Sequence, residues 1–181
     1  MKIGMRRLQL FILLFAMCSL LFQLPPEAFA STPSDITAAG TIQEHVVTSP
    51  ELHGAHGVST FTIDGSTYAI VASYTDDGVQ IIDISDPDNI VAKGYAENGV
   101  NSFSVLDGPR GVDTFVIGDS TYAIITSVGD DGVWIIDISD PEDMVLKDSE
   151  TDEANSFDEL DRPEGVDTFV IGDSTYAIVA S

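Results

Sequence analysis

Cysteine is almost missing from this chain. The one cysteine, Cys18, lies in an apolar run near the N-terminus, and none follows it. Residues 31–181 therefore exclude disulfides, thiol nucleophiles and cysteine-ligated metal sites. They also contain no phosphate-binding loop, no dinucleotide-binding fingerprint and no zinc-ligand spacing. The stability of this part of the chain must come from packing and hydrogen bonding.

Basic residues are scarce as well. Lys and Arg number 7 against 30 Asp and Glu, and the net charge is −23 at pH 7. This balance argues against a nucleic-acid partner, because phosphate binding requires a basic surface. An apolar content of 44% argues against disorder. Two interpretations of the charge stay open: a soluble protein kept dispersed by repulsion, and a protein that binds divalent cations.

The first 30 residues have the pattern of a secretory signal peptide. Three basic residues precede the apolar run Leu8–Leu24, and two prolines and the small-x-small sequence Ala28–Ala30 follow it. Cleavage after Ala30 would leave 4 basic and 29 acidic residues, a net charge of −25. The run also has the length of a membrane span, about 17–25 residues, so an uncleaved anchor is the alternative. Both outcomes predict an extracellular or cell-surface protein.

A repeat of 54 residues organises the rest of the chain. The stretch GVDTFVIGDSTYAI starts at Gly111 and again at Gly165, and a looser copy, GVSTFTIDGSTYAI, starts at Gly57. IIDISDP starts at Ile81 and recurs at the same shift, and the segment 31–40 aligns with the segment 54 residues later. The chain after the predicted cleavage site therefore begins in the last quarter of a unit. Such periods are typical of propellers and solenoids.

Each unit predicts four strands. In the first complete unit they cover residues 57–63, 66–73, 79–85 and 89–97. Asp-Gly and Asp-Asp-Gly signals between them predict hairpin turns. The second strand is apolar throughout, which indicates burial on both faces, and the fourth is the most polar, which indicates the outermost position. No stretch has a helical period of useful length.

Tandem units of four antiparallel strands predict an all-β fold of β-propeller-like blades. We assign the chain to these parts: signal peptide 1–30, outer strand of a preceding blade plus loop 31–56, blades 57–110 and 111–164, and the first half of a third blade, 165–181. These are about 2.8 units, fewer than the roughly 4–8 blades of a closed ring. We therefore expect an incomplete ring, an open arc that is a fragment of a longer propeller. Its last strand would have an exposed apolar edge.

The pattern YAIVAS…DDGVQIIDISDP resembles the LVIVD-repeat β-propeller proteins. The resemblance covers residues 31–181. It implies a secreted or surface-associated propeller, in a family mostly without known activity and with no established catalytic residues. The unit here is longer than a common blade, and its surplus lies between Asn98 and Pro109.

Several recurring residues have structural interpretations. Gly118-Asp119-Ser120 has the letters of an esterase nucleophile motif, but the first copy, Asp64-Gly65-Ser66, keeps the turn residues and loses the motif. We therefore predict hairpin turns and no catalytic residues. A Phe and a Tyr recur in each unit and predict core between blades. Asp83 and Asp137 lie among apolar strand residues, so we expect their carboxylates to bind backbone or hydroxyl groups.

Paired carboxylates are the first candidate metal ligands. Asp76-Asp77 and Asp130-Asp131 fall in the turns between the second and third strands. In a four-stranded meander these turns lie at the same end as the loops that carry Asp107 and Asp161. Carboxylates and carbonyls together are what Ca²⁺ prefers, although no complete calcium-loop motif is present. Solvated turn residues are the alternative.

Histidines are the second candidate ligands. His45, His53 and His56 precede the first complete unit, and imidazole suits Cu, Zn and Ni. The repeat places His53 over Asp107 and Asp161, which favours a variable polar loop position instead. We expect no obligatory cofactor.

Together these features predict a non-catalytic secreted or cell-surface repeat scaffold. Its partner would be an unidentified protein or surface ligand, bound by the acidic loops that follow the second and fourth strands of each unit. A membrane would be involved only through an uncleaved N-terminus. The alternative is a metal-dependent enzyme or electron-transfer protein that uses the loop carboxylates or the three histidines.

Overall fold

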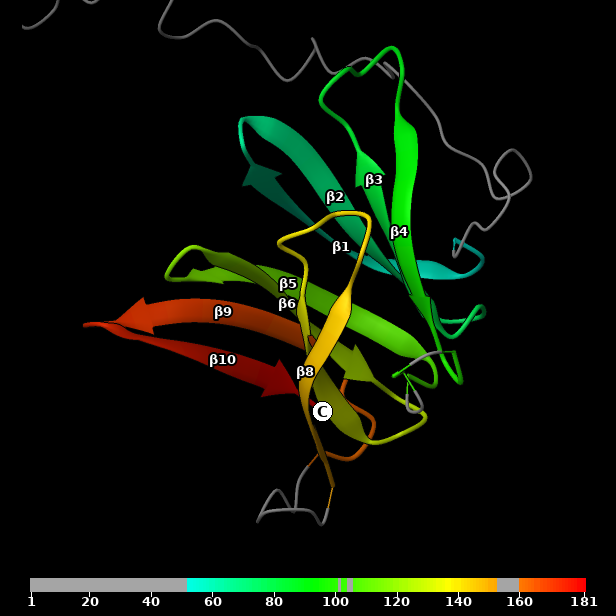
Figure 1. The fold of residues 1–181 in the computed structure, drawn as a ribbon. Helices are drawn as coiled ribbons and strands as arrows, with labels where there is room; N and C mark the ends of the chain where they lie inside the picture. Colours follow the sequence, from blue (N-terminus) through cyan, green and yellow to red (C-terminus); the bar gives the residue numbers. More distant parts are fainter. Residues whose placement is uncertain (1–51, 101, 104–105, 153–159) are drawn as a thin grey trace, which may run out of the picture. The chain divides into compact units, whose positions relative to one another are not determined.

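The computed structural model describes residues 52–100, 102–103, 106–152 and 160–181 as three antiparallel β-sheets (Figure 1). The predicted signal peptide, the predicted outer strand of a preceding blade and His45 lie outside the described residues. Within the described ranges there is no helix of the length and apolarity that a membrane crossing requires. The prediction of an all-β protein is confirmed.

Two sheets have four strands and one has two, and in each the neighbours follow the chain order. The strands of the first sheet are β1 (Ala55–Ile63), β2 (Ser66–Ser73), β3 (Gly78–Asp83) and β4 (Val91–Glu97). Those of the second are β5 (Pro109–Ile117), β6 (Ser120–Ser127), β7 (Gly132–Asp137) and β8 (Val145–Thr151). The last sheet pairs β9 (Gly165–Ile171) with β10 (Ser174–Ala180).

The predicted strand order is confirmed, with the polar fourth strand at the edge of each four-stranded sheet. The first strand begins two residues earlier than predicted, at Ala55 and Pro109, because a register shift lets each strand pair beyond its glycine. The fourth strand begins later, at Val91, because Asp86 turns the chain and accepts the amide of Asp88 at 3.1 Å. The described residues form no closed barrel or ring, so the propeller assignment stays a proposal.

The Gly-Asp-Ser motif is a hairpin turn, as predicted. Ile117 pairs with Ser120, so Gly118 and Asp119 are the two turn residues, and the φ of Gly118 is 64°. In the first sheet Asp64 and Gly65 both have positive φ, 50° and 82°. Glycine first is typical of a type II′ turn, and Asp-Gly of a type I′ turn. The two copies therefore differ in letter order because they use different hairpin turns.

The recurring aromatic pairs lie across hairpins. Phe61 stacks on Tyr68 with ring centroids 5.4 Å apart, and the equivalent pairs in the other two sheets are at 5.5 and 5.7 Å. Phe61 is buried, but the third pair, Phe169 and Tyr176, is 42% and 47% exposed. Cross-strand pairing holds these rings together without a core around them. The prediction that they are all core is therefore wrong for the third unit.

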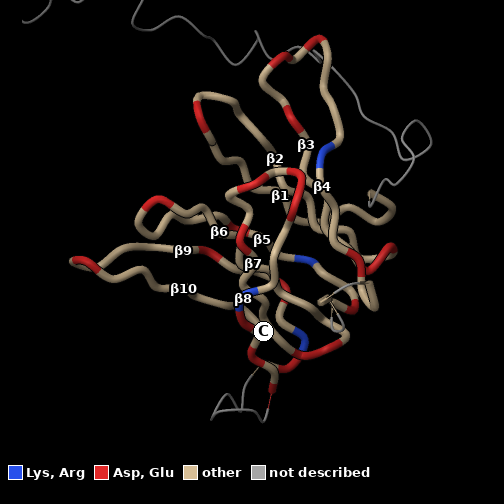
Figure 2. Tube along the Cα trace, in the orientation of Figure 1, with Lys and Arg blue, Asp and Glu red and all other residues tan. Residues whose placement is uncertain are grey.

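The first strands of the three sheets join the sheets to one another. β5 packs against β1 and β2, and β9 packs against β5 and β6. The core between them is aliphatic and contains the single tryptophan, Trp134, which is fully buried. Asp113 in β5 reaches both neighbours: its carboxylate accepts the hydroxyl of Ser59 in β1 at 3.2 Å and the amide of Thr168 in β9 at 2.7 Å. Many of the other acidic residues lie in turns and loops (Figure 2).

Candidate functional site

The predicted carboxylate pairs lie in the turns after β2 and β6, where they contact the loops that lead into the first strands. The first carboxylate of each pair accepts an amide from the loop before its own sheet. Asp76 accepts the amide of His53 at 2.6 Å, and Asp130 accepts the amide of Asp107 at 2.7 Å. The predicted placement of these turns beside the loops is confirmed.

The second carboxylate of each pair reaches the following loop. Asp77 accepts the amide of Gly108 at 2.8 Å, and Asp131 accepts the amide of Arg162 at 2.9 Å. Asp77 and Asp131 have positive φ, 52° and 48°, a conformation that Asp tolerates better than most residues. Each Asp-Asp turn therefore joins the loop before one sheet to the loop before the next.

The same turns also hold the long loop after the fourth strand. The carbonyl of Asp77 accepts the amide of Asn98 at 2.8 Å, and the side chain of Asn98 accepts the amide of Leu106 at 3.3 Å. The second unit repeats both contacts with Asp131, Asp152 and Leu160. Because Leu106 is fully buried, the loop is anchored at both ends.

Replacing Asp77 tests this anchoring role. Asp77→Ala should lower the free energy of unfolding by about 1–2 kcal/mol, because it removes a charged hydrogen bond and places alanine at positive φ. Asp77→Asn, which keeps a side-chain oxygen and tolerates this φ, should cost less than half as much. Urea denaturation followed by circular dichroism measures both. Equal losses for the two variants would contradict the assignment.

Negative charge is concentrated around Asp107. Desolvation raises the pKa of the Asp107 carboxyl, and the nearby charges of Asp77 and Asp130 raise it further. Beside this group, Arg110 pairs with Glu164 in the next loop and lies 4.8 Å above the ring of Tyr74. The loop end of the sheets thus carries an acidic group next to an ion pair between units.

The predicted metal ligands are used differently in this arrangement. The carboxylates of the two Asp pairs accept backbone amides, and His53 is held by its amide, with its Nδ1 3.8 Å from Asp76 Oδ1. His56 packs edge-on against Tyr74 with ring centroids 5.8 Å apart. Across the described ranges, no three His, Cys, Asp or Glu side chains are grouped to hold a metal ion.

Asp83 and Asp137 bind as predicted. The Ser85 amide donates to Asp83 Oδ1 and the Ser139 amide to Asp137 Oδ1, both at 3.0 Å. Hydrogen bonds from the Ser85 amide and hydroxyl lower the pKa of Asp83. Hydrogen bonds from Ser139 and the ion pair with Lys147 lower the pKa of Asp137. These carboxylates terminate the third strands and are not available for catalysis.

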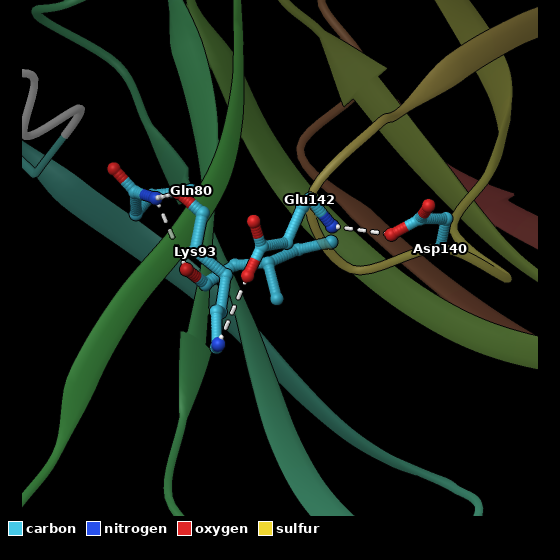
Figure 3. Close-up of polar contacts among 5 residues, drawn as sticks. Gln80, Lys93, Asp140 and Glu142 are labelled. Atoms are coloured by element: carbon cyan, nitrogen blue, oxygen red, sulfur yellow. Dashed lines mark hydrogen bonds and ion pairs between the residues drawn. The ribbon is translucent and has the colours of Figure 1, made fainter.

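A hollow of about 630 Å³ lies between β4 and the segment 142–145 before β8. Lys93 pairs with Glu142 at 3.0 Å beside it, and the amide of Gly94 donates to the carbonyl of Pro141 at 2.8 Å (Figure 3). The buried Gln80 donates to the carbonyls of Lys93 and Gly94 at 3.1 and 2.8 Å, at the point where the β3–β4 register shifts. These contacts tie β4 to the next unit.

The sequence alone did not indicate this hollow or the role of Gln80. The only signal was that Trp134 stands 54 residues after Gln80 in an otherwise matching strand. Both side chains are fully buried, so the two units fill one interior position in different ways.

The fold and the loop site define a class: an all-β repeat protein whose tandem antiparallel sheets are joined by anchored acidic loops. No protein-family model matches the chain. No curated protein matches it either.

Proposed function

We propose that this chain is a non-catalytic scaffold of β-propeller-type blades, secreted or displayed at the cell surface, which binds a partner through its acidic loops. One observation carries the proposal. The Asp-Asp turns anchor equivalent loops in the same way, while the residues displayed on these loops differ from unit to unit: His53, Asp107 and Asp161 share one position, and His56, Arg110 and Glu164 share another. A rigid frame with variable contacts is typical of recognition surfaces.

The blade assignment is supported by the order of the strands and by the packing of first strands against one another. The family proposed is the LVIVD-repeat propellers, on the sequence pattern given above. The partner surface proposed is basic, because the loops carry an excess of carboxylates.

A basic peptide probes this surface. A decalysine peptide should bind the protein made from the full 181-residue chain, and the variant Asp107→Asn/Asp161→Asn/Glu164→Gln should bind it at least about fivefold more weakly. The control variant Asp64→Asn/Asp119→Asn/Asp173→Asn removes the same charge from the hairpin turns. Those turns are a strand length away, roughly 20 Å and beyond the Debye length of about 8 Å at physiological salt. Fluorescence anisotropy measures both affinities.

Equal weakening by both variants would contradict a loop surface, because it would show a response to net charge alone. Excess EDTA should change neither the affinity nor the melting temperature. Loss of either with EDTA, restored by Ca²⁺ or Zn²⁺, would favour the metal-dependent alternative.

A further inference from the structure

The first and last of the described sheets each leave uncovered a surface that the other units cover. Val58 in β1 is 63% exposed, whereas the equivalent Val112 in β5 is 7% exposed because β1 packs against β5. Ile178 in β10 is 61% exposed, whereas the equivalent Ile70 and Ile124 are 0% and 4% exposed. We call the uncovered face of β1 the head surface and the uncovered face of β9–β10 the tail surface.

The contact between units needs only three strands. The first sheet meets the second through β1, β2 and β5, and the second meets the third through β5, β6 and β9. Each interface thus combines the first two strands of one unit with the first strand of the next. The tail surface contains the first two strands of a unit, and the head surface is a first strand. Both halves of the interface are therefore present on one chain.

The sequences of the two halves match those of the internal interfaces. β9, Gly165–Ile171, is identical to residues 111–117 of β5, and β10, Ser174–Ala180, is identical to residues 66–72 of β2. The tail surface is therefore built of residues that already pack against a first strand elsewhere in the same molecule.

A row of hydrogen bonds crosses each internal interface. The carboxylate of Asp113 accepts the amide and the hydroxyl of Thr168 in the next unit, at 2.7 and 2.5 Å. One unit earlier, the hydroxyl of Ser59 contacts that of Thr114 at 2.9 Å. The third residue of this row, Asp167, is exposed and accepts the amide of Thr168 in its own strand at 3.0 Å. Thr60, the first threonine of the row, is exposed on β1.

A glycine in each first strand marks where the chains come closest. A Cβ at Gly57 would overlap the carbonyl oxygen of Arg110, and a Cβ at Gly111 would lie 2.8 Å from the carbonyl oxygen of Glu164. At Gly165 the nearest atom to such a Cβ is that of Ala180, at 3.8 Å. Gly165 thus has open space where its two equivalents hold a carbonyl of the next unit.

We propose that copies of this chain associate head to tail, with β9–β10 of one copy packed on β1 of a second. Asp167 accepts the amide and hydroxyl of Thr60 of the second copy, and Gly165 lies against the carbonyl of His56 of the second copy. Glu164 then comes opposite His56, as it pairs with Arg110 within the chain. Such a heterologous contact builds rings or filaments, because each added copy presents a new tail surface.

Sedimentation of the protein made from the full chain tests this over a concentration series. The average mass should rise with concentration, and Asp167→Asn should weaken association at least about tenfold, because it removes a charged hydrogen-bond acceptor. Asp173→Asn, an equal change of charge at the exposed hairpin turn, should leave association within about twofold. A wild-type chain that stays monomeric throughout, or equal effects of the two variants, would overturn the proposal.

Mixing two blocked variants gives the sharpest test. Gly165→Val blocks the tail surface and Val58→Asp blocks the head surface, and both positions are open enough in the single chain for the variants to fold. Each variant alone should be monomeric, and an equimolar mixture should form a dimer and nothing larger. Dimers of Val58→Asp alone would show symmetric pairing through the edge of β10 and would overturn head-to-tail association. Unchanged circular dichroism and melting temperature establish that both variants are folded.

Discussion

Ile124→Ala should lower the free energy of unfolding by about 2–5 kcal/mol, and Ile178→Ala by less than about 0.5 kcal/mol. The two isoleucines end identical 14-residue segments that form the same hairpin in two units. Ile124 is 4% exposed in β6, and Ile178 is 61% exposed in β10. Removing three carbons leaves a cavity at the first position and only a smaller exposed surface at the second.

Urea denaturation at a low protein concentration, where head-to-tail contacts are dissociated, measures this pair. Each isoleucine is the control for the other, because local sequence and strand propensity are the same at both sites. Equal losses would show that β10 is as buried as β6 in solution. The exposure of Ile178, and with it the tail surface, would then be wrong.

Asp113→Ala should lower the free energy of unfolding by about 1.5–3 kcal/mol at neutral pH. The carboxylate bridges β1 and β9, and its loss leaves the amide of Thr168 without this acceptor. Hydrogen bonds to a charged group contribute about this much to stability. The control is Asp167→Ala, the equivalent exposed position in β9, which should cost less than about 0.5 kcal/mol in the single chain.

The effect of Asp113→Ala should depend on pH. Burial by itself would raise the pKa of Asp113, but the hydrogen bonds from Thr168, Thr114 and Ser59 outweigh it and lower the pKa. The folded state therefore binds fewer protons than the unfolded state, in which the pKa of Asp is about 3.9. The stabilisation is complete above about pH 4 and is lost as the pH falls through the lowered pKa.

The measurement is the difference in unfolding free energy between wild type and Asp113→Ala from pH 7 down to acid. Asp83 and Asp137 also have lowered pKa values, but their contributions cancel in this difference. The difference should be constant at neutral pH and should shrink below about pH 4. A difference that grows on acidification would contradict the assignment, because it would require a raised pKa.

Strands and turns were predictable because their causes are local. Alternating β-branched residues set the strands, and the pairs Asp64-Gly65 and Gly118-Asp119 set the hairpin turns through their φ angles. The order of strands within a sheet followed from short turns. The bulges near Val58 and Val112 were missed, since they depend on pairing with the next strand.

The loop site was predictable in place but not in function. The sequence put Asp77 beside the loops, and the structure shows that its carboxylate binds an amide 31 residues away and bridges two units. Gln80 gave almost no signal, because its partners are carbonyls at the bulge in β4. Hydrogen bonds between distant segments depend on the packing of sheets, which a local pattern does not contain.

By itself, the sequence determined the 54-residue unit, the four strands within it, and the turn chemistry that excludes a catalytic Gly-Asp-Ser. Only the tertiary structure decided which copies of the same residue are covered. Ile124 and Ile178 have identical neighbours in sequence but differ from 4% to 61% in exposure. The physical reason is that burial is conferred by the adjoining strands and sheets. β6 has β7 beside it, and β10 has only β9 among the described strands.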